Sequence, residues 1–254
     1  MGISIRPTGM TSATHALRYW ERRQEVAANN LANVSTDGFK AERAFARLLD
    51  TAHPTIDTAT DLRAGTLRPT GEPMDIAIGG DGFLVVATPE GERLTRGGSL
   101  RFDDRNRLVD LQGNPVLGTD GAIVVKPGEM TPDAVDVDPL AVPQGGGPLV
   151  QVDRTGRVQV NGRTIATLRV EQVPVAQNLQ HAGAGLFIPP DGRFAVAEAD
   201  RDIRQGFLED SNVSTVGAMV DMIGIQRAYA SVQKAVTTLD QMRGIVTAEL
   251  GKPV

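Results

Sequence analysis

Residues 10–40, MTSATHALRYWERRQEVAANNLANVSTDGFK, are the stretch from which we interpret the rest of the chain. From Met10 the apolar side chains recur at alternating steps of three and four residues, the spacing of a narrow helical seam. The pattern ends at Ser35–Gly38, a run of turn-forming residues in which Gly38 can adopt a positive φ. The stretch therefore predicts an amphipathic helix that stops sharply near Asn33.

Two interpretations of this helix are open at the level of sequence. It could cover a globular core as an ordinary surface helix, or it could pack against other helices. The seam is narrow and much of it is alanine or glutamine, which suits close helix–helix packing better than the covering of a β core. Asn30 and Asn33 share one face and could bond the main-chain groups that a helix end leaves free, or they could simply mark the helix stop.

A second long apolar-periodic segment, residues 213–250, lies at the other end of the chain. Asn212 and Ser214, at the start of this segment, have side chains that cap helices. Since these ends carry the only long helical patterns, we predict that they pack on each other or on neighbouring copies. The residues expected in that assembly interface are, towards the N-terminus, Met10, Leu17, Trp20, Ala27, Asn30, Leu31, Asn33, Gly38 and Phe39, and, towards the C-terminus, Met222, Ile225, Tyr229, Val232, Val236 and Leu239.

The composition excludes several classes of function. The chain has 254 residues, a net charge of −5 and no block rich in Lys or Arg, so the electrostatic footprint of a nucleic-acid-binding protein is missing. It has no cysteine, which excludes disulfides, thiol catalysis and cysteine-ligated metals. No apolar run is long enough to span a membrane, and residues 1–10 lack the apolar core of a secretion signal. We therefore expect neither membrane insertion nor signal cleavage.

Between the two helical ends the pattern is that of short β-strands. The 28 glycines and 15 prolines indicate many turns. FLVVA at residues 83–87 is continuously apolar, as expected for a strand buried on both faces. Asn161-Gly162 between two alternating runs is a strong hairpin signal, and FIPPDGRFAV at residues 187–196 predicts one more hairpin. Because no helical pattern separates the strands, we expect antiparallel pairing.

We therefore predict an α+β fold, with N- and C-terminal α-helices that form a coiled-coil-like layer and a mainly antiparallel β body between them. The predicted domains are a terminal helical (coiled-coil) domain of residues 1–40 and 206–254, a connector of residues 41–73 and a β-rich outer domain of residues 74–205. A short extended segment is expected within the connector, at Leu62–Pro69.

No catalytic constellation emerges from the sequence. His15, His53 and His181 show no ligand spacing among them. The glycine-rich runs do not open a helix, so a phosphate cradle is not expected, and the acidic residues are scattered at turns. We predict no enzymatic activity and no catalytic, cofactor-binding or metal-binding residue. The alternative from another class is a soluble β-rich binding module whose helices pack on its own β core.

Four separated segments resemble the flagellar axial proteins of the rod and hook, in the order in which that family carries them. They are ANNLANVSTDGFK (Ala28–Lys40), LRPTGEPMDIAIGGDGFLVVATPEGERLTRGGSLRFD (Leu67–Asp103), QGFLEDSNVS (Gln205–Ser214) and MVDMIGIQRAYASVQKAV (Met219–Val236). The chain departs from the family pattern in ways that keep the apolar, turn or helical character of each position, at Leu84, Leu94, Asn106 and Ala230.

The resemblance implies a structural role without cofactors. Family members stack helically around a central channel, with the terminal helices in an inner coiled-coil layer and the β body outside. It also implies export without cleavage through the flagellar type III apparatus, a place in the periplasmic rod, and partners among copies of the chain and neighbouring rod and hook proteins. The short connector after Lys40 and the run NPVLGTDGAIVVKPG (residues 114–128) are most similar to proximal-rod members. Distal-rod or other hook–basal-body subunits are the alternative.

Overall fold

The computed structural model describes residues 9–48, 54–126, 128, 149–174 and 179–250. The chain forms two compact units. The first, here called the helical unit, comprises residues 1–34, 41–61 and 213–254. The second, the β unit, comprises residues 35–40 and 62–212. The chain therefore passes between the units four times, and each unit is described by itself below.

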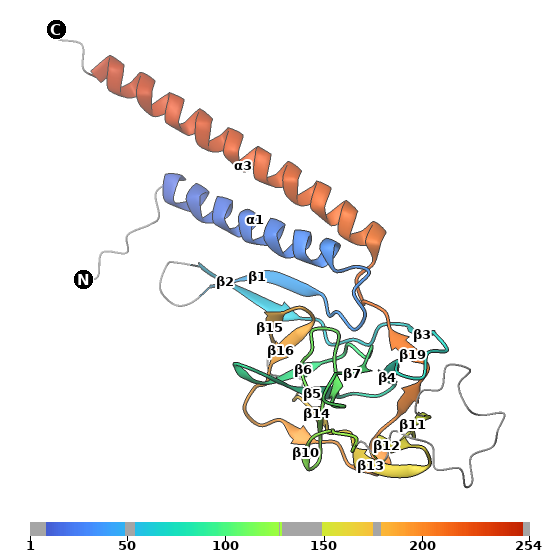
Figure 1. Ribbon diagram of the computed structural model, residues 1–254. Coiled ribbons are helices and arrows are strands. Elements are labelled where there is room, and N and C mark those ends of the chain that lie inside the picture. The colour runs from blue at the N-terminus through green and yellow to red at the C-terminus, as the bar shows by residue number, and fades with distance from the viewer. Residues whose placement is uncertain (1–8, 49–53, 127, 129–148, 175–178, 251–254) are drawn as a thin grey trace. The chain divides into compact units, whose positions relative to one another are not determined.

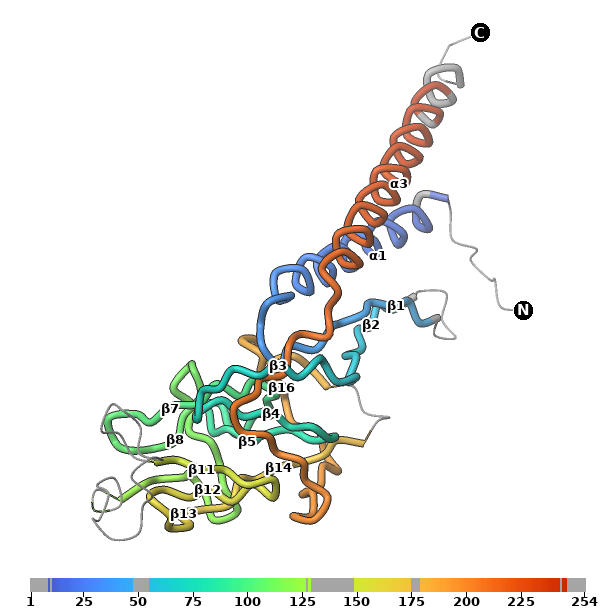
Figure 2. The backbone as a smooth tube through the Cα atoms, turned by 90° about the vertical axis from the view of Figure 1, so that its right-hand side faces the viewer, coloured from blue at the N-terminus to red at the C-terminus, as the bar shows by residue number. Residues whose placement is uncertain are grey.

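The helical unit contains the two helices that the sequence predicts. α1 spans Gly9–Ala32 and α3 spans Thr215–Leu250. The two helices contact each other and run antiparallel, side by side (Figures 1 and 2). Among the described residues, neither helix has an apolar stretch of the length needed to cross a membrane. The predicted N- and C-terminal helices are thus confirmed, and α1 has its first helical partner within the same chain.

A β-hairpin completes the helical unit where the sequence predicts a connector. β1 (Glu42–Leu48) pairs antiparallel with β2 (Pro54–Thr60), and β1 contacts α1. The amide of Asp61 donates to the carbonyl of Ala41 at 2.7 Å and closes the base of the ladder. ERAFARL has no strict alternation, so its strand conformation comes from its partners rather than from its own pattern.

The main sheet of the β unit has six strands, in the order β15-β16-β6-β5-β14-β17. Every pairing in it is antiparallel, as predicted. Phe83, Leu84, Val85 and Val86 in β5 are each at most 4% exposed, which confirms a strand buried on both faces. The strands are β5 (Phe83–Thr88), β6 (Gly91–Thr95), β14 (Val170–Gln172), β15 (Gln180–Gly183), β16 (Leu186–Ile188) and β17 (Phe194–Ala195).

Two hydrophobic clusters flank this sheet, because alternate residues of β5 point to opposite faces. Leu84 and Val86 belong to the larger cluster, with Leu168 and Ile203. Phe83 and Val85 belong to the smaller cluster, with Phe187 among others. A single continuous apolar strand therefore supplies both cores.

The hairpin predicted at Asn161-Gly162 is confirmed. Both residues have positive φ, 50° for Asn161 and 78° for Gly162, as a two-residue hairpin turn of this type requires. The Asn161 side-chain oxygen also accepts a hydrogen bond from the amide of Leu149 at 3.0 Å. The three-stranded sheet around this turn consists of β11 (Val150–Val152), β12 (Arg157–Val160) and β13 (Arg163–Thr167).

The hairpin predicted for residues 187–196 is wrong. β16 pairs with β15 and β6, whereas β17 pairs with β14 at the other edge of the sheet. The real turn precedes β16, at Ala184 (φ 51°) and Gly185 (φ 74°). After β16, Pro189-Pro190 offers no amide donor for a ladder, so the chain leaves the sheet before it returns as β17.

The first and last strands of the β unit pair with each other. β3 (Leu67–Pro69) pairs with β19 (Phe207–Glu209), and β4 (Ile76–Ile78) pairs with β18 (Ile203–Gln205). β3 lies in the extended segment expected within the connector. The remaining elements are β7 (Arg101–Phe102) paired with β8 (Leu108–Val109), β9 (Leu117–Gly118) paired with β10 (Gly121–Ala122), and the 3-10 helix η1 (Glu198–Asp200).

The unit boundaries differ from the predicted domains for a physical reason. Residues 206–212 belong to the β unit because β19 pairs with β3. Residues 35–40 belong to it because the Gly38 amide bonds the Glu209 carbonyl at 2.6 Å and the Asn212 amide bonds the Phe39 carbonyl at 3.3 Å. The chain segments next to both helices are thus built into the β unit.

Candidate assembly surfaces and the buried charge cluster

The predicted interface residues of α3 lie along one stripe of the helix. Ile225 is the most buried of them, at 4% exposed. Met222, Tyr229, Val232 and Val236 are half-buried, and Leu239 is exposed. Burial is deepest where α3 lies beside α1 and ends towards the C-terminus of the helix. The outer part of the predicted stripe is therefore unoccupied within a single chain.

α1 buries only part of its predicted seam. Ala27 is 8% exposed, whereas Leu17, Trp20 and Leu31 are half-buried. The side chain of Met10 lies outside the described residues. Val26, at 5% exposed, is buried more deeply than any predicted residue within α1. It was not predicted, because the single stripe of three- and four-residue steps passes through Ala27 instead.

A second apolar face of α3 was not predicted. Val216, Met219, Val220 and Ile223 are between 50% and 72% exposed and follow one another at helical spacing. Towards the C-terminus, Met242 and Ile245 are similarly exposed. A helix with apolar side chains on two faces is typical of a helix with more than one packing partner. The sequence contained this signal, but it was obscured by the stronger stripe through Ile225.

Asn30 connects the end of α1 to the hairpin. Its side-chain amide donates to the Glu42 carbonyl at 2.8 Å, and its side-chain oxygen accepts from the Glu42 amide at 2.9 Å. The side chain thus imitates one residue of a neighbouring strand. Asn33 instead donates to the carbonyl of Asn29 at 2.9 Å, so one of the two amides bonds the helix end, as the sequence suggested, and the other bonds β1.

Gly38 and Phe39 are buried in the β unit. Gly38 has φ +69°, and a β-carbon there would lie 2.3 Å from the carbonyl carbon of Arg96, so no other residue fits. Phe39 is 3% exposed and its ring centroid lies 5.4 Å from that of His181, which in turn packs on Phe187. Both predicted interface residues therefore contact their own chain.

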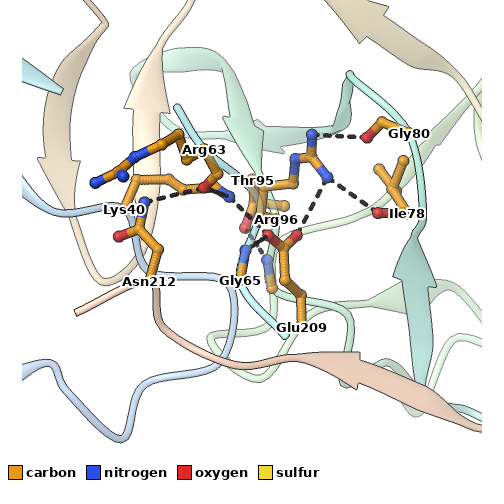
Figure 3. A network of polar contacts seen from close by, with 10 residues as sticks. Lys40, Arg63, Gly65, Ile78, Gly80, Thr95, Arg96, Glu209 and Asn212 are labelled. Atoms are coloured by element: carbon orange, nitrogen blue, oxygen red, sulfur yellow. Dashed lines mark hydrogen bonds and ion pairs between the residues drawn. The ribbon is translucent and has the colours of Figure 1, made fainter. Parts of the chain in front are cut away.

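A buried cluster of three charges lies beside them (Figure 3). The Lys40 ammonium donates to Glu209 Oε1 at 2.6 Å, and Arg96 Nη1 donates to Glu209 Oε2 at 3.1 Å. The three side chains are at most 3% exposed. Two cations therefore share one carboxylate out of contact with water.

Main-chain groups form hydrogen bonds with most of the remaining donors and acceptors of the cluster. Lys40 also donates to the carbonyl of Arg63 at 2.8 Å, and Glu209 Oε1 accepts from the amide of Gly65 at 2.7 Å. Arg96 donates to the carbonyls of Ile78 at 3.1 Å and Gly80 at 2.9 Å, as Figure 3 shows. Arg96 Nε is buried without a hydrogen-bond partner. The bonds that the other polar atoms of the cluster make offset much of the cost of burying its charges.

Burial changes the acidity of Arg96. Desolvation lowers the pKa of its guanidinium from the ordinary value, and the negative charges of Glu209 and Asp81 oppose that change. The guanidinium carbon also lies 5.1 Å from the ring centroid of Phe83, which gives the cation a favourable aromatic contact.

The cluster connects three segments of the β unit, each next to a point where the chain leaves or enters that unit. Lys40 follows α1, Arg63 follows the hairpin, and Glu209 precedes α3. Asn212 adds a bond from its side-chain amide to the Arg63 carbonyl at 3.0 Å. Sequence reasoning missed the cluster, because Lys40 and Glu209 are 169 residues apart and nothing in either segment specifies the other.

The polar groups of the β unit form no catalytic arrangement among the described residues. A pocket of about 220 Å³ is lined by Asp37 and Asp110, among others. Asp37 pairs with Arg68 at 3.1 Å, and Asp110 accepts from the Asn114 side chain at 2.9 Å. In the described part of the chain no group of His, Cys, Asp and Glu residues could hold a metal ion, and His53 lies outside that part.

Three family models match the chain in the order of its elements. "Flagella basal body rod protein" matches residues 10–40, "Flagellar hook protein FlgE/F/G D1 domain" residues 77–160, and "Flagellar basal body rod FlgEFG protein C-terminal" residues 204–249. The flagellar basal-body rod protein FlgF of Salmonella typhimurium is 34% identical, over 93% of this chain and 94% of that protein. The chain belongs to the flagellar basal-body rod protein family.

Other members of the family show the same coverage. FlgF of Escherichia coli is 31% identical over 93% of this chain and 94% of its own length. The rod protein FlgG of Borreliella burgdorferi is 31% identical over 87% of this chain and 90% of its own. The family is a structural component of the rod in the basal body of the bacterial flagellum, and the chain is most similar to its FlgF type.

Proposed function

We propose that this chain is a structural subunit of the proximal rod and assembles helically through its terminal helices. The similarity to FlgF proteins over more than nine-tenths of the chain supports the placement in the proximal rod. The distal rod is the alternative, because FlgG proteins are similar over nearly the same range. On this proposal the partners are copies of the chain and the neighbouring rod and hook proteins.

The observation that carries the proposal is the exposed apolar face of α3. Val216, Met219, Val220 and Ile223 are at least 50% exposed, although the other face of the helix packs on α1. Surface helices of stable monomers normally bury one apolar stripe and present polar residues elsewhere. We therefore assign the second stripe to the helices of neighbouring subunits, which together would form the coiled-coil inner layer.

Assembly would then complete the packing of both helices. α3 has 36 residues and α1 has 24, so α3 extends about 18 Å further at 1.5 Å per residue. Leu239, Met242 and Ile245 lie towards its exposed C-terminal end. Helices without a full set of partners are only marginally stable in water. We expect the helical unit to gain order when neighbouring copies cover these side chains, which restricts growth to the end of the rod.

The role is non-enzymatic on this proposal. The subunit would be exported by the flagellar type III apparatus without cleavage and would need no cofactor. Its helical unit would face the channel and its β unit would make the outer contacts of the rod.

The test is to place the protein in isolated basal bodies. A tagged chain should appear between the membrane ring and the distal rod, by electron microscopy of purified basal bodies. A tag found in the distal rod would favour the FlgG-like alternative. A tag found only outside the rod would contradict the assignment to the rod.

A paired variant tests the surface itself. The double change Met219→Ser and Ile223→Ser should leave the circular dichroism of the purified chain unchanged, since both residues are exposed, but should abolish rod assembly and motility. Asp221→Ser, at an exposed polar position on another side of the same helix, is the matched control and should assemble normally. Normal assembly of the double variant would refute the role of this face.

A further inference from the structure

The buried charge cluster contains more positive than negative charge. Lys40 and Arg96 are both cationic, and Glu209 is the only anion buried with them in the described residues. Asp81 influences Arg96 from an exposed position. The carbonyls of Arg63, Ile78 and Gly80 accept hydrogen bonds but neutralise no charge. Glu209 is therefore the buried carboxylate that both cations share.

The three charges come from widely separated parts of the chain. Glu209 is 113 residues from Arg96 and 169 residues from Lys40. It is also the last residue of β19, the strand that completes the β unit by pairing with β3. Because a chain is made from its N-terminus, both cations exist long before their shared anion.

An incomplete β unit would have to bury Lys40 and Arg96 without the Glu209 carboxylate. Folding the strands around Arg96 removes its guanidinium from water, and packing residues 38–40 onto them does the same for Lys40. Burial of a charge without its partner is among the most unfavourable events in folding. Closure is therefore opposed until Glu209 is present.

We infer that the Glu209 carboxylate makes closure of the β unit conditional on its last strand, so that the unit does not fold around an incomplete chain. This property does not depend on the assembly proposed above. Strand pairing alone would also couple the first and last strands, since β3 and β4 pair with β19 and β18. The inference is that the charges add a barrier beyond strand pairing, and this difference can be measured.

The experiment follows hydrogen exchange during refolding of the full-length chain from urea. Pulses of labelling at increasing times are read by mass spectrometry on peptides that cover residues 83–95 and residues 203–210. In the unmodified chain, amides of β5 and β6 should become protected in the same kinetic phase as those of β19. Protection of β5 and β6 in an earlier phase would overturn the inference.

A triple variant separates charge from strand pairing. Lys40→Met, Arg96→Met and Glu209→Met together replace the three charged groups by unbranched apolar side chains. In this variant β5 and β6 should become protected before β19, because no cation awaits a partner. If the two regions still gain protection together, strand pairing accounts for the coupling and the inference fails.

Two further variants guard against an uninformative result. If the triple variant does not fold, Glu209→Gln is measured instead. Loss of protection in β5 and β6 together with β19 would support the inference. Native protection of β5 and β6 would contradict it. Asp210→Asn is the matched control, since Asp210 is adjacent and forms an exposed pair with Arg68. The order of protection should be unchanged in that variant, and a change there would refute the specific role of Glu209.

Discussion

The ammonium of Lys40 lies 2.6 Å from the carboxylate of Glu209, although 169 residues separate them in the chain. Each side chain is 1% exposed. The pair connects the segment that follows α1 with β19, the strand that precedes α3. It therefore holds together two parts of the β unit that the sequence does not show to be neighbours.

Glu209→Gln should destabilise the β unit by about 3–5 kcal/mol, because it removes the carboxylate that the buried Lys40 and Arg96 share. Urea denaturation followed by hydrogen exchange in β5 measures the loss. Asp210→Asn removes only an exposed ion pair and should cost less than about 1 kcal/mol. Equal losses of unfolding free energy in the two variants would show that burial of the cluster does not determine the contribution of Glu209 to stability.

Gly38→Ala should be far more harmful than Gly71→Ala. Both glycines have similar positive φ, +69° and +75°, so both variants share a conformational cost of about 1 kcal/mol. A β-carbon at Gly38 would also lie 2.3 Å from the Arg96 main chain, whereas at Gly71 it meets nothing within 4 Å. The difference in unfolding free energy should be at least about 2 kcal/mol, and similar values would argue against the close approach.

Ile225→Ala should destabilise the helical unit by about 2–4 kcal/mol, since its side chain is 4% exposed. Trp20 is the single tryptophan of the chain and lies in α1, so its fluorescence reports on this unit during urea titration. Ile223→Ala is the control, because Ile223 is 51% exposed, and should change stability by less than about 0.5 kcal/mol. A reversed order would mean that the buried face of α3 is misassigned.

Asn30→Asp keeps an acceptor for the Glu42 amide but loses the donor to the Glu42 carbonyl. It should cost about 1 kcal/mol, and Asn30→Ala, which loses both bonds, should cost more. Hydrogen exchange at the Glu42 amide distinguishes the two variants, because only Asn30→Ala removes the acceptor of that amide and should speed its exchange. Unchanged protection in Asn30→Ala would show that another group holds the hairpin to α1.

The turn carboxylate of Asp103 should titrate at an unusually low pH. A hydrogen bond from the Arg107 amide is the main cause that holds its pKa below the ordinary value, and the Arg107 side chain and the Arg105 amide act in the same direction. Because the folded-state pKa is depressed, its contribution is present above the unfolded-state pKa and is lost as the pH falls through the folded value. Carbon-detected NMR titration of Asp103 measures this, and Asp103→Asn should remove that acid dependence.

Local patterns predicted the elements whose signals are local. FLVVA was read as a doubly buried strand because both faces of β5 lie in cores, and Asn161-Gly162 was read as a turn because both positions require positive φ. The two helices followed from their spacing alone. In these cases a few adjacent residues contain the whole physical cause.

The sequence failed where the cause lies in distant partners. β1 has no strict alternation and becomes a strand through β2 and through the Asn30 side chain. Residues 187–196 looked like a hairpin, but β16 and β17 find partners at opposite edges of the sheet. The charge cluster depends on three segments at once, so neither its existence nor its burial could be inferred from any one of them.

The charge cluster also has a mechanical consequence. The chain passes between the two units at residues 34–35, 40–41, 61–62 and 212–213, and three of these passages lie within a few residues of Lys40, Arg63 and Glu209. A load carried along the chain from the helices would therefore enter the β unit at segments that the Lys40–Glu209 bond holds to one another.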